Sequence, residues 1–395
     1  MAKIILKAGR EEAVKRRHPW IFSGAVAAVE GAPQAGQTVQ VCASDGALLA
    51  HAAYSPRSQI RGRVWSFSAD TPVDSALIGR RIDAALEARR RLGMTPPNDA
   101  FRLVHAEADG LPGLVVDSYG PYLVCQFLSA GAEYWRREIV ALLAEKIGCS
   151  GIFERSDAPV RQLEGLALRK GPLWGSQPPA RIKIRQDPFL FWVDVKNGQK
   201  TGFFLDQRIN RLRCAAWSDR RSVLNCFAYT GAFAVAALKG GAAHVVNLEA
   251  SAGATELARL NCGLNGLPES RWENVLGNAF DLMRTYVGQG RRFDMVVLDP
   301  PKFAGSRGQL PAALRAYKEI NLQAFRLLNA EGCLVTFSCS GVLGRDLFQK
   351  VVAEAALDAG RKAQILEHLQ QGPDHPIDLH FPESAYLKGL VCRVV

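Results

Sequence analysis

A single stretch decides the fold class: residues 222–233, which read SVLNCFAYTGAF. An apolar run over 222–226 enters a short turn that contains Gly231, and a second apolar run with helical spacing follows. A strand, a turn and a helix in this order are typical of nucleotide-binding α/β domains, which hold a ligand at the carboxyl ends of their strands. The stretch therefore predicts an α/β fold with a ligand site beside residues 227–231.

Strands and helices alternate around this stretch, from residue 220 onward. We predict strands over 222–226, 243–248, 272–276, 293–298 and 333–338, and helices over 232–239, 252–264, 312–328 and 345–358. Such alternation implies a parallel sheet covered by helices on both faces. The tail over 385–394 has the pattern of a final strand.

The preceding part of the chain has a different pattern. Residues 1 to about 72 consist of short strand-like runs separated by Gly and Pro, which predicts a small β-barrel. An amphipathic helix is expected over 75–92, followed by a mixed α/β region, and residues 171–179 (GPLWGSQPP) are rich in turn formers and predict a linker or a domain edge. We therefore expect three domains: 1–74, 75–185 and 186–395.

Composition excludes several classes of protein. With 395 residues, 48% hydrophobic and 22% charged, the chain is too apolar to be disordered. No apolar run approaches the roughly 20 residues that span a bilayer, and the N-terminus lacks the apolar core of a signal peptide. The nine cysteines form no CxxC pair and the seven histidines no HExxH, so we expect a cytoplasmic protein without a metal.

Basic residues are concentrated near the N-terminus. The whole chain has a net charge of 49 − 38 = +11, and residues 1–91 alone contribute 14 − 8 = +6. Such an excess attracts the phosphates of nucleic acid. The run Lys15-Arg16-Arg17 favours an RNA-binding surface, although a merely solvated basic face is the alternative.

The turns after the strands carry the candidate site. Neither GxGxxG nor GxxxxGK[ST] occurs, which argues against a dehydrogenase and an NTPase. Glu249 ends the second strand about 20 residues after the first turn, where a carboxylate can accept the hydroxyls of a ribose. Asn278 follows the third strand and is either an adenine ligand or an ordinary turn residue. The loop and the acid together favour an adenosine cofactor.

The fourth and fifth strands end in reactive groups. Asp299 opens a loop that Pro300 and Pro301 make rigid, and it could hold a base by its polar edge. Cys339 follows the fifth strand, beside the expected position of that loop, where a thiol could attack an unstacked base. We interpret the other eight cysteines as structural.

Together these residues resemble a known family, the bacterial S-adenosylmethionine-dependent 23S rRNA (cytosine-C5) methyltransferases of the RlmI type. The similarity runs in order along nearly the whole chain, through RRHPWIFSGAV (16–26), EADGLPG (107–113), KTGFFLDQR (200–208), NCFAYTG (225–231), DPPKF (299–303) and FSCSG (337–341). It implies an N-terminal PUA β-barrel, a central α/β domain and a C-terminal Rossmann-like methyltransferase. It also implies a cytosine in 23S rRNA, usually cytosine 1962, as the target.

The resemblance implies roles for individual residues. It implies that S-adenosyl-L-methionine, or its product S-adenosyl-L-homocysteine, is held without a metal, with Cys339 as nucleophile and Asp299 on the cytosine. The cofactor contacts are expected to come from Phe227, Tyr229, Thr230, Gly231, Glu249, Asn278 and Asp299, with Thr201, Gln207 and Arg208 closing over them. For RNA we expect contacts from Lys302, Phe303, Lys15, Arg16 and Arg17, and for the protein a monomer or homodimer that does not bind membranes.

This sequence departs from the family pattern at three places. The family usually has Asp at positions 249 and 278, where this chain has Glu249 and Asn278. Many RNA cytosine methyltransferases also carry a second cysteine after the fourth-strand proline, where Pro301-Lys302 stands here. Product release therefore cannot use a second thiol. Two alternative functions stay open: a purine N-methyltransferase acting on rRNA, and a non-catalytic RNA-binding protein.

Overall fold

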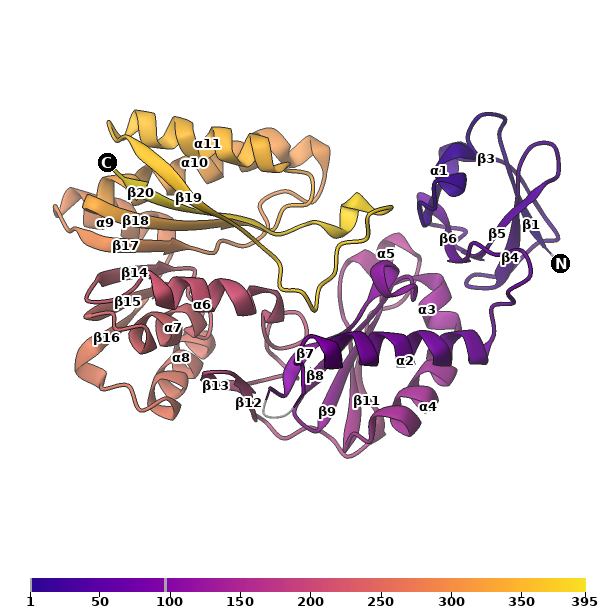
Figure 1. Ribbon diagram of the computed structural model, residues 1–395, viewed down its shortest axis with the longest axis horizontal. Helices are drawn as coiled ribbons and strands as arrows, with labels where there is room; N and C mark the ends of the chain where they lie inside the picture. The colour runs from indigo at the N-terminus through magenta and orange to yellow at the C-terminus, as the bar shows by residue number, and fades with distance from the viewer. Residues whose placement is uncertain (1, 96–97) are drawn as a thin grey trace. The chain divides into compact units, whose positions relative to one another are not determined.

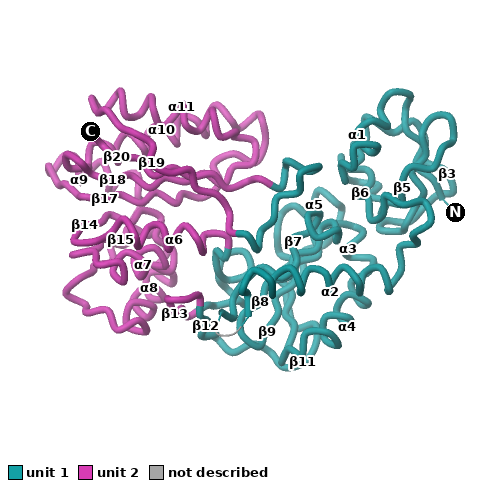
Figure 2. Tube along the Cα trace, viewed as in Figure 1, with its two compact units in different colours: residues 1–185, 193–205, 373–384 teal, residues 186–192, 206–372, 385–395 magenta. Residues whose placement is uncertain are grey.

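The protein separates into two compact units (Figure 2). The computed structural model describes residues 2–95 and 98–395, so residue 1 and residues 96–97 of the expected domains lie outside the described residues. The first unit contains residues 1–185, 193–205 and 373–384, and the second contains 186–192, 206–372 and 385–395. Among the described residues, no helix is both long and apolar enough to cross a membrane.

The N-terminal part of the first unit is a six-stranded sheet. Its order is β2-β6-β5-β4-β1-β3, with β1 (Lys3–Leu6), β2 (Trp20–Phe22), β3 (Val26–Glu30), β4 (Thr38–Cys42), β5 (Leu48–Tyr54) and β6 (Ile60–Ser66). All neighbouring strands are antiparallel except β1 and β4. Alternate residues such as Val39 and Val41 face a small apolar core, which confirms the period-two pattern of this region. The short helix α1 (Glu12–Lys15) precedes β2.

A second, five-stranded sheet completes the first unit. Its order is β11-β10-β9-β8-β7, and it packs with the predicted amphipathic helix α2 (Ser75–Arg91). Its strands are β7 (Ala100–His105), β8 (Leu114–Tyr119), β9 (Tyr122–Phe127), β10 (Gly151–Ser156) and β11 (Arg169–Gly175), and its other helices are α3 (Ala130–Tyr134), α4 (Arg136–Ile147) and α5 (Val160–Leu163). The linker prediction is wrong for residues 171–175, because β11 pairs with β10 there. Gly and Pro are tolerated since β11 is an edge strand.

The second unit contains a seven-stranded sheet of order β16-β15-β14-β17-β18-β20-β19 (Figure 1). Its strands are β14 (Ser222–Cys226), β15 (His244–Glu249), β16 (Trp272–Leu276), β17 (Phe293–Leu298), β18 (Leu328–Ser338), β19 (Ala363–Gln370) and β20 (Lys388–Val394). The first five are parallel, as predicted, and β20 lies antiparallel between β18 and β19. The hairpin β12 (Ile182–Gln186) and β13 (Phe189–Val193) precedes this sheet in the chain.

Helices cover both faces of this sheet, as the alternation predicted (Figure 1). Helices α6 (Arg208–Ala216), α7 (Ala232–Lys239) and α8 (Ala252–Leu264) lie on one face, and α9 (Ala279–Gly288), α10 (Leu310–Leu327) and α11 (Arg345–Asp358) on the other. The predictions missed α6, α9 and β19. Strand β19 mixes polar and apolar residues and is mostly exposed, so it lacks the continuous apolar run that marks the interior strands. Because five strands are parallel, the loops after β14, β15, β16, β17 and β18 meet at one edge of the sheet.

Candidate active site

The loop after β14 is held in a strained conformation. Phe227 and Tyr229 have φ angles of 58° and 47°, in the left-handed region that non-glycine residues seldom adopt. Gly231, at φ 74°, precedes α7, and a Cβ there would lie 2.8 Å from the Cβ of Ala258. Only glycine therefore fits this close approach of the loop to α8. Strain of this kind persists where the surrounding structure enforces it, as it does in ligand-binding loops.

Glu249 locks this loop to the end of β15. Its Oε2 accepts a hydrogen bond from the backbone N–H of Tyr229 at 2.7 Å, and its Oε1 accepts one from the N–H of Ser251 at 2.9 Å. The structure thus brings the loop and the acid together, as their spacing indicated. Thr230 is buried, and its hydroxyl has no hydrogen-bond partner in the part of the chain that the structure describes. This edge therefore offers a carboxylate and an unused hydroxyl to a polar ligand.

Asn278 acts as the N-cap of α9, because its Oδ1 accepts the N–H of Phe280 at 2.9 Å. Sequence reasoning missed Phe280, whose ring centroid lies 6.0 Å from that of Phe227 and 5.9 Å from that of Phe303. Phe227 lies in the loop after β14, Phe280 in the first turn of α9 after β16, and Phe303 in the loop after β17. The sequence did offer a signal for this cluster, because a phenylalanine occurs within five residues of the end of each of these three strands. These aromatic faces line the same edge as Glu249.

Asp299 meets a residue from a distant part of the second unit. Gln207, buried before α6, donates from Nε2 to the Asp299 Oδ1 at 3.0 Å. Asn210 in turn donates to the Gln207 Oε1 at 2.5 Å, which fixes the orientation of that amide. The resemblance singled out both Gln207 and Asp299, and the structure places them in contact. Lys302 is exposed in the same loop, and Phe303 is half-buried.

Cys339 is partly exposed at the end of β18, whereas its neighbours Ser338 and Ser340 are fully buried. Tyr317 of α10 fixes both serines: the Ser338 hydroxyl donates to its hydroxyl at 2.9 Å, and the Ser340 hydroxyl lies 3.1 Å from it. The N–H of Ala304 donates to Ser340 Oγ at 3.3 Å. This bond ties the Asp299 loop to the Cys339 loop, so the two predicted catalytic groups lie in adjoining, rigid turns.

Burial raises the pKa of most of the other cysteine thiols. Burial raises the pKa of Cys226 well above its ordinary value and that of Cys333 to about 11. Because the thiolate is the nucleophile, neither group reacts readily near neutral pH. Cys149 in the first unit is also partly exposed, but burial raises its pKa. The interpretation of Cys226 and Cys333 as structural residues fits their surroundings.

Lys388 is a buried cation beside Cys339 that sequence reasoning missed. It lies opposite Ser338 in the β18–β20 pairing, and its Nζ donates to the carbonyls of Ser340 at 2.6 Å and Leu343 at 2.7 Å. The pKa of Lys388 is lowered to about 8, chiefly by burial; Cys339 acts to raise it, and Arg345 and Lys302 act to lower it. At neutral pH the ammonium is therefore mostly charged, next to the thiol.

The remaining predicted contacts lie elsewhere. Thr201 belongs to the first unit, where it is buried and its hydroxyl donates to Asp117 Oδ2 at 2.6 Å. Arg208 begins α6 in the second unit and is buried. Lys15, Arg16 and Arg17 are exposed on and after α1. Within residues 2–95 and 98–395, the structure contains no cluster of His, Cys, Asp and Glu suited to a metal ion.

The fold and the site define the class of S-adenosylmethionine-dependent methyltransferases. Residues 173–393 match this family, and residues 4–67 match the PUA-like domain family. A putative SAM-dependent methyltransferase from Streptococcus mutans shares the fold with a TM-score of 0.87 and 22% identity over all of both chains. A putative methyltransferase solved in complex with SAH gives a TM-score of 0.88 at 21% identity, also over all of both chains.

A curated relative narrows this class. Ribosomal RNA large subunit methyltransferase I of Escherichia coli (strain K12) is 46% identical over 393 residues, which cover 100% of this chain and 99% of the relative. The chain therefore belongs to the family of ribosomal RNA large subunit methyltransferase I. The resemblance inferred from the sequence is confirmed, and so are the methyltransferase fold and the PUA-like domain.

Proposed function

We propose that the protein methylates C5 of a cytosine in 23S rRNA, usually cytosine 1962 in this family, through a covalent bond between Cys339 and C6 of the base. The observation that best supports this proposal is the position of Cys339. Its thiol is partly exposed at the carboxyl end of β18, in a turn that a hydrogen bond joins to the Asp299 loop. The E. coli relative acts on large-subunit rRNA by its name, which supports the same partner here.

The residues present fit the family cofactor. The Glu249 carboxylate, the strained 227–231 backbone and the unpaired Thr230 hydroxyl form one polar edge flanked by aromatic rings. We assign cofactor binding to Phe227, Tyr229, Thr230, Gly231, Glu249, Asn278 and Asp299, with Thr201, Gln207 and Arg208 as closing residues. When bound, S-adenosylmethionine supplies an electrophilic methyl group.

In the proposed mechanism the protein makes C5 of cytosine nucleophilic. The Cys339 thiolate adds to C6, which shifts electron density onto C5 so that C5 can take a methyl group. Asp299 holds the polar edge of the ring and stabilises the adduct, and Gln207 keeps that carboxylate in place. Loss of the C5 proton then expels the thiolate and restores the ring. The target base must be unstacked, at a cost of a few kcal/mol.

RNA binding in this proposal involves both units separately. Lys302 and Phe303 lie in the Asp299 loop, where they could contact the target nucleotide. Lys15, Arg16 and Arg17 provide a cationic surface on the PUA-like domain that attracts phosphates. The domain division at 74 and 185, the cytoplasmic location and a monomeric or homodimeric state are part of the same proposal.

A purine N-methyltransferase is the second candidate. A structure with a TM-score of 0.50 and 20% identity, over 71% of this chain and 76% of that chain, is the Methanocaldococcus jannaschii tRNA m1G37 methyltransferase. A purine ring nitrogen attacks the methyl group through its own lone pair, after loss of its proton where it carries one, and needs no thiol adduct. Cys339→Ala therefore separates the two reactions, because it stops cytosine methylation and spares purine methylation.

Glu249→Ala is expected to weaken cofactor binding by about tenfold to a hundredfold, since hydrogen bonds to a charged group contribute about 1.5–3 kcal/mol. Titration calorimetry with S-adenosylhomocysteine measures this change. Glu256→Ala, an exposed carboxylate of α8 in an ion pair with Arg259, is the matched control and should bind as the native protein does. Unchanged affinity in Glu249→Ala would contradict the role of Glu249 in cofactor binding. Tighter binding of NAD than of S-adenosylhomocysteine would contradict the assignment of the cofactor.

Lys388→Met is expected to move the pH midpoint of Cys339 alkylation upward by about one unit, because the adjacent cation favours the thiolate. The rate of iodoacetamide labelling on the Cys339 peptide, followed by mass spectrometry from pH 6 to 10, measures this shift. Lys388→Arg keeps the charge and should restore much of the native profile, and Cys149 serves as the internal control. If the pH profile of Cys339 labelling in Lys388→Met were identical to that of the native protein, Lys388 would act only by holding the carbonyls of Ser340 and Leu343.

A further inference from the structure

The connection between β19 and β20 leaves the methyltransferase sheet and belongs to the first unit. Residues 373–384 of this connection, here called the β19–β20 loop, are anchored in two places. At one end Asp374 accepts the N–H of Arg102 at 3.0 Å through its carboxylate, and its carbonyl accepts Arg89 Nη2 at 2.9 Å. These bonds join the loop to the helix α2 and the strand β7 of the central sheet.

The other end of the loop is anchored on the PUA-like domain. The Phe381 ring packs on Trp20 with 4.7 Å between centroids and on His18 with 5.6 Å. Glu383 Oε2 lies 3.2 Å from His18 Nε2. A residue near the start of the chain therefore contacts one that is 365 positions away. These contacts hold the β19–β20 loop against the PUA-like domain.

The tip of the loop is a hydrogen-bonded turn that presents two side chains to solvent. Asp378 accepts the N–H of Phe381 at 3.0 Å and, through Oδ1, the N–H of His380 at 2.7 Å. This turn projects Leu379, which is 94% exposed. A single exposed apolar side chain is ordinary on a protein surface, so Leu379 indicates a partner only together with the groups that surround it.

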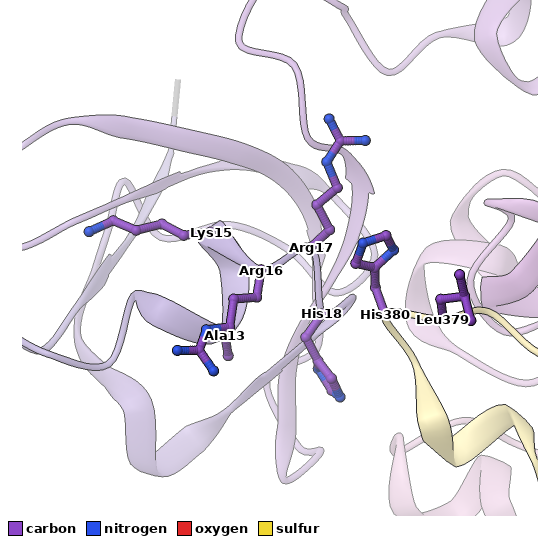
Figure 3. Close-up of a pocket in the computed structure, with 7 residues that line it drawn as sticks. All are labelled: Ala13, Lys15, Arg16, Arg17, His18, Leu379 and His380. Carbon is purple, nitrogen blue, oxygen red and sulfur yellow. The ribbon is translucent and has the colours of Figure 1, made fainter.

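Leu379 and His380 face the PUA-like domain across a pocket of about 620 Å³ (Figure 3). The other walls come from Ala13, Lys15, Arg16, Arg17 and His18. Lys15 has ion pairs with Glu11 and Glu12. In the described residues no carboxylate forms an ion pair with Arg16 or Arg17, and no acidic side chain lines the pocket. The pocket therefore combines two available guanidinium groups with one apolar and one flat side chain.

We propose that this pocket binds an unpaired RNA nucleotide together with its neighbouring phosphates. Arg16 and Arg17 pair with the phosphates, and His380 and Leu379 contact the base and sugar. Guanidinium groups suit phosphate geometry, and recognition of single-stranded RNA relies on flat or apolar side chains against unstacked bases. The inference rests on the proposed rRNA substrate and adds a second contact region, to which the β19–β20 loop contributes.

The test measures RNA affinity apart from catalysis. A fluorescent single-stranded RNA is titrated with the full-length protein at several salt concentrations, by anisotropy. The Arg16→Ala/Arg17→Ala variant should bind about tenfold or more weakly at low salt, and the slope of log Kd against log salt should fall by about 2, because two phosphates lose their partners. Leu379→Ala/His380→Ala should weaken binding by about three- to tenfold with an unchanged slope, since no ion is released.

Controls keep this inference separate from the catalytic one. Arg91→Ala removes an exposed arginine of α2 that pairs with Glu87 outside the pocket, and it should bind RNA as the native protein does. The pocket variants should raise the KM for rRNA in proportion to their loss of RNA affinity. Native RNA affinity in Leu379→Ala/His380→Ala would exclude the loop from RNA binding, and native affinity in all variants would exclude RNA from the pocket. Absence of methylation in every protein, with these binding changes intact, would contradict the proposed reaction alone.

Discussion

Cys339→Ser is expected to abolish the covalent complex that the native protein forms with RNA carrying 5-fluorocytosine at the target position. In the native protein the thiolate adds to C6 and C5 is methylated, but fluorine cannot leave as a cation, so the adduct accumulates. A serine hydroxyl is far less acidic and less nucleophilic than a thiol. Methylation of ordinary rRNA should fall by about four orders of magnitude or more. Denaturing gels of labelled RNA measure the adduct, and tritium transfer measures the rate.

Two buried cysteines of the same sheet are the controls for this experiment. Cys226 and Cys333 lie in β14 and β18, and burial raises the pKa of both thiols. Cys226→Ala and Cys333→Ala should each still trap the RNA. If Cys339→Ser trapped RNA and Cys226→Ala did not, the nucleophile would be Cys226 on β14. If Cys339→Ala still methylated RNA, on a purine, the second candidate function would replace the first.

Asp299→Asn is expected to slow adduct formation and methylation by about a hundredfold to a thousandfold. The substitution keeps the size of the side chain but replaces the carboxylate, which hydrogen bonds the base near N3 or N4 as the thiolate adds, by an amide that cannot share a proton with the ring. Single-turnover methylation with saturating RNA isolates this step from RNA binding. Affinity for S-adenosylhomocysteine should fall only slightly, because Asp299 is one of seven assigned cofactor contacts and the Glu249 contacts with the 227–231 loop are untouched.

Two further variants define the role of Asp299. Asp281→Asn removes an exposed carboxylate of α9 and should leave the rate unchanged. Gln207→Met removes the donor to Asp299 Oδ1 and should lower the rate by a smaller factor, because the carboxylate remains but is no longer held in place. A native rate in Asp299→Asn would mean that another group holds the cytosine. A rate unaffected by Gln207→Met would mean that the loop alone positions Asp299.

Much of the second unit could be predicted because its signals are local. The runs over 232–239, 252–264 and 345–358 became helices with the predicted bounds, since each combines an apolar face with clear ends. Four of the five parallel strands were recognised from largely buried apolar runs, whereas the edge strand β16 is only partly buried. The spacing of Glu249 from the 227–231 loop also anticipated their contact, because parallel strands end at a common edge. Strand β19 was missed because it mixes polar and apolar residues and is mostly exposed.

The sequence by itself determined the family, the parallel sheet, and the loops that carry Asp299 and Cys339. It could not determine which distant segments meet these loops. Lys388 reaches Cys339 only because β20 is inserted antiparallel beside β18, and Gln207 reaches Asp299 only through folding. In the first unit, the contact between His18 and Glu383 joins residues 365 positions apart. Local patterns follow from short-range backbone and side-chain preferences, whereas such pairings depend on how whole elements pack, which no local signal encodes.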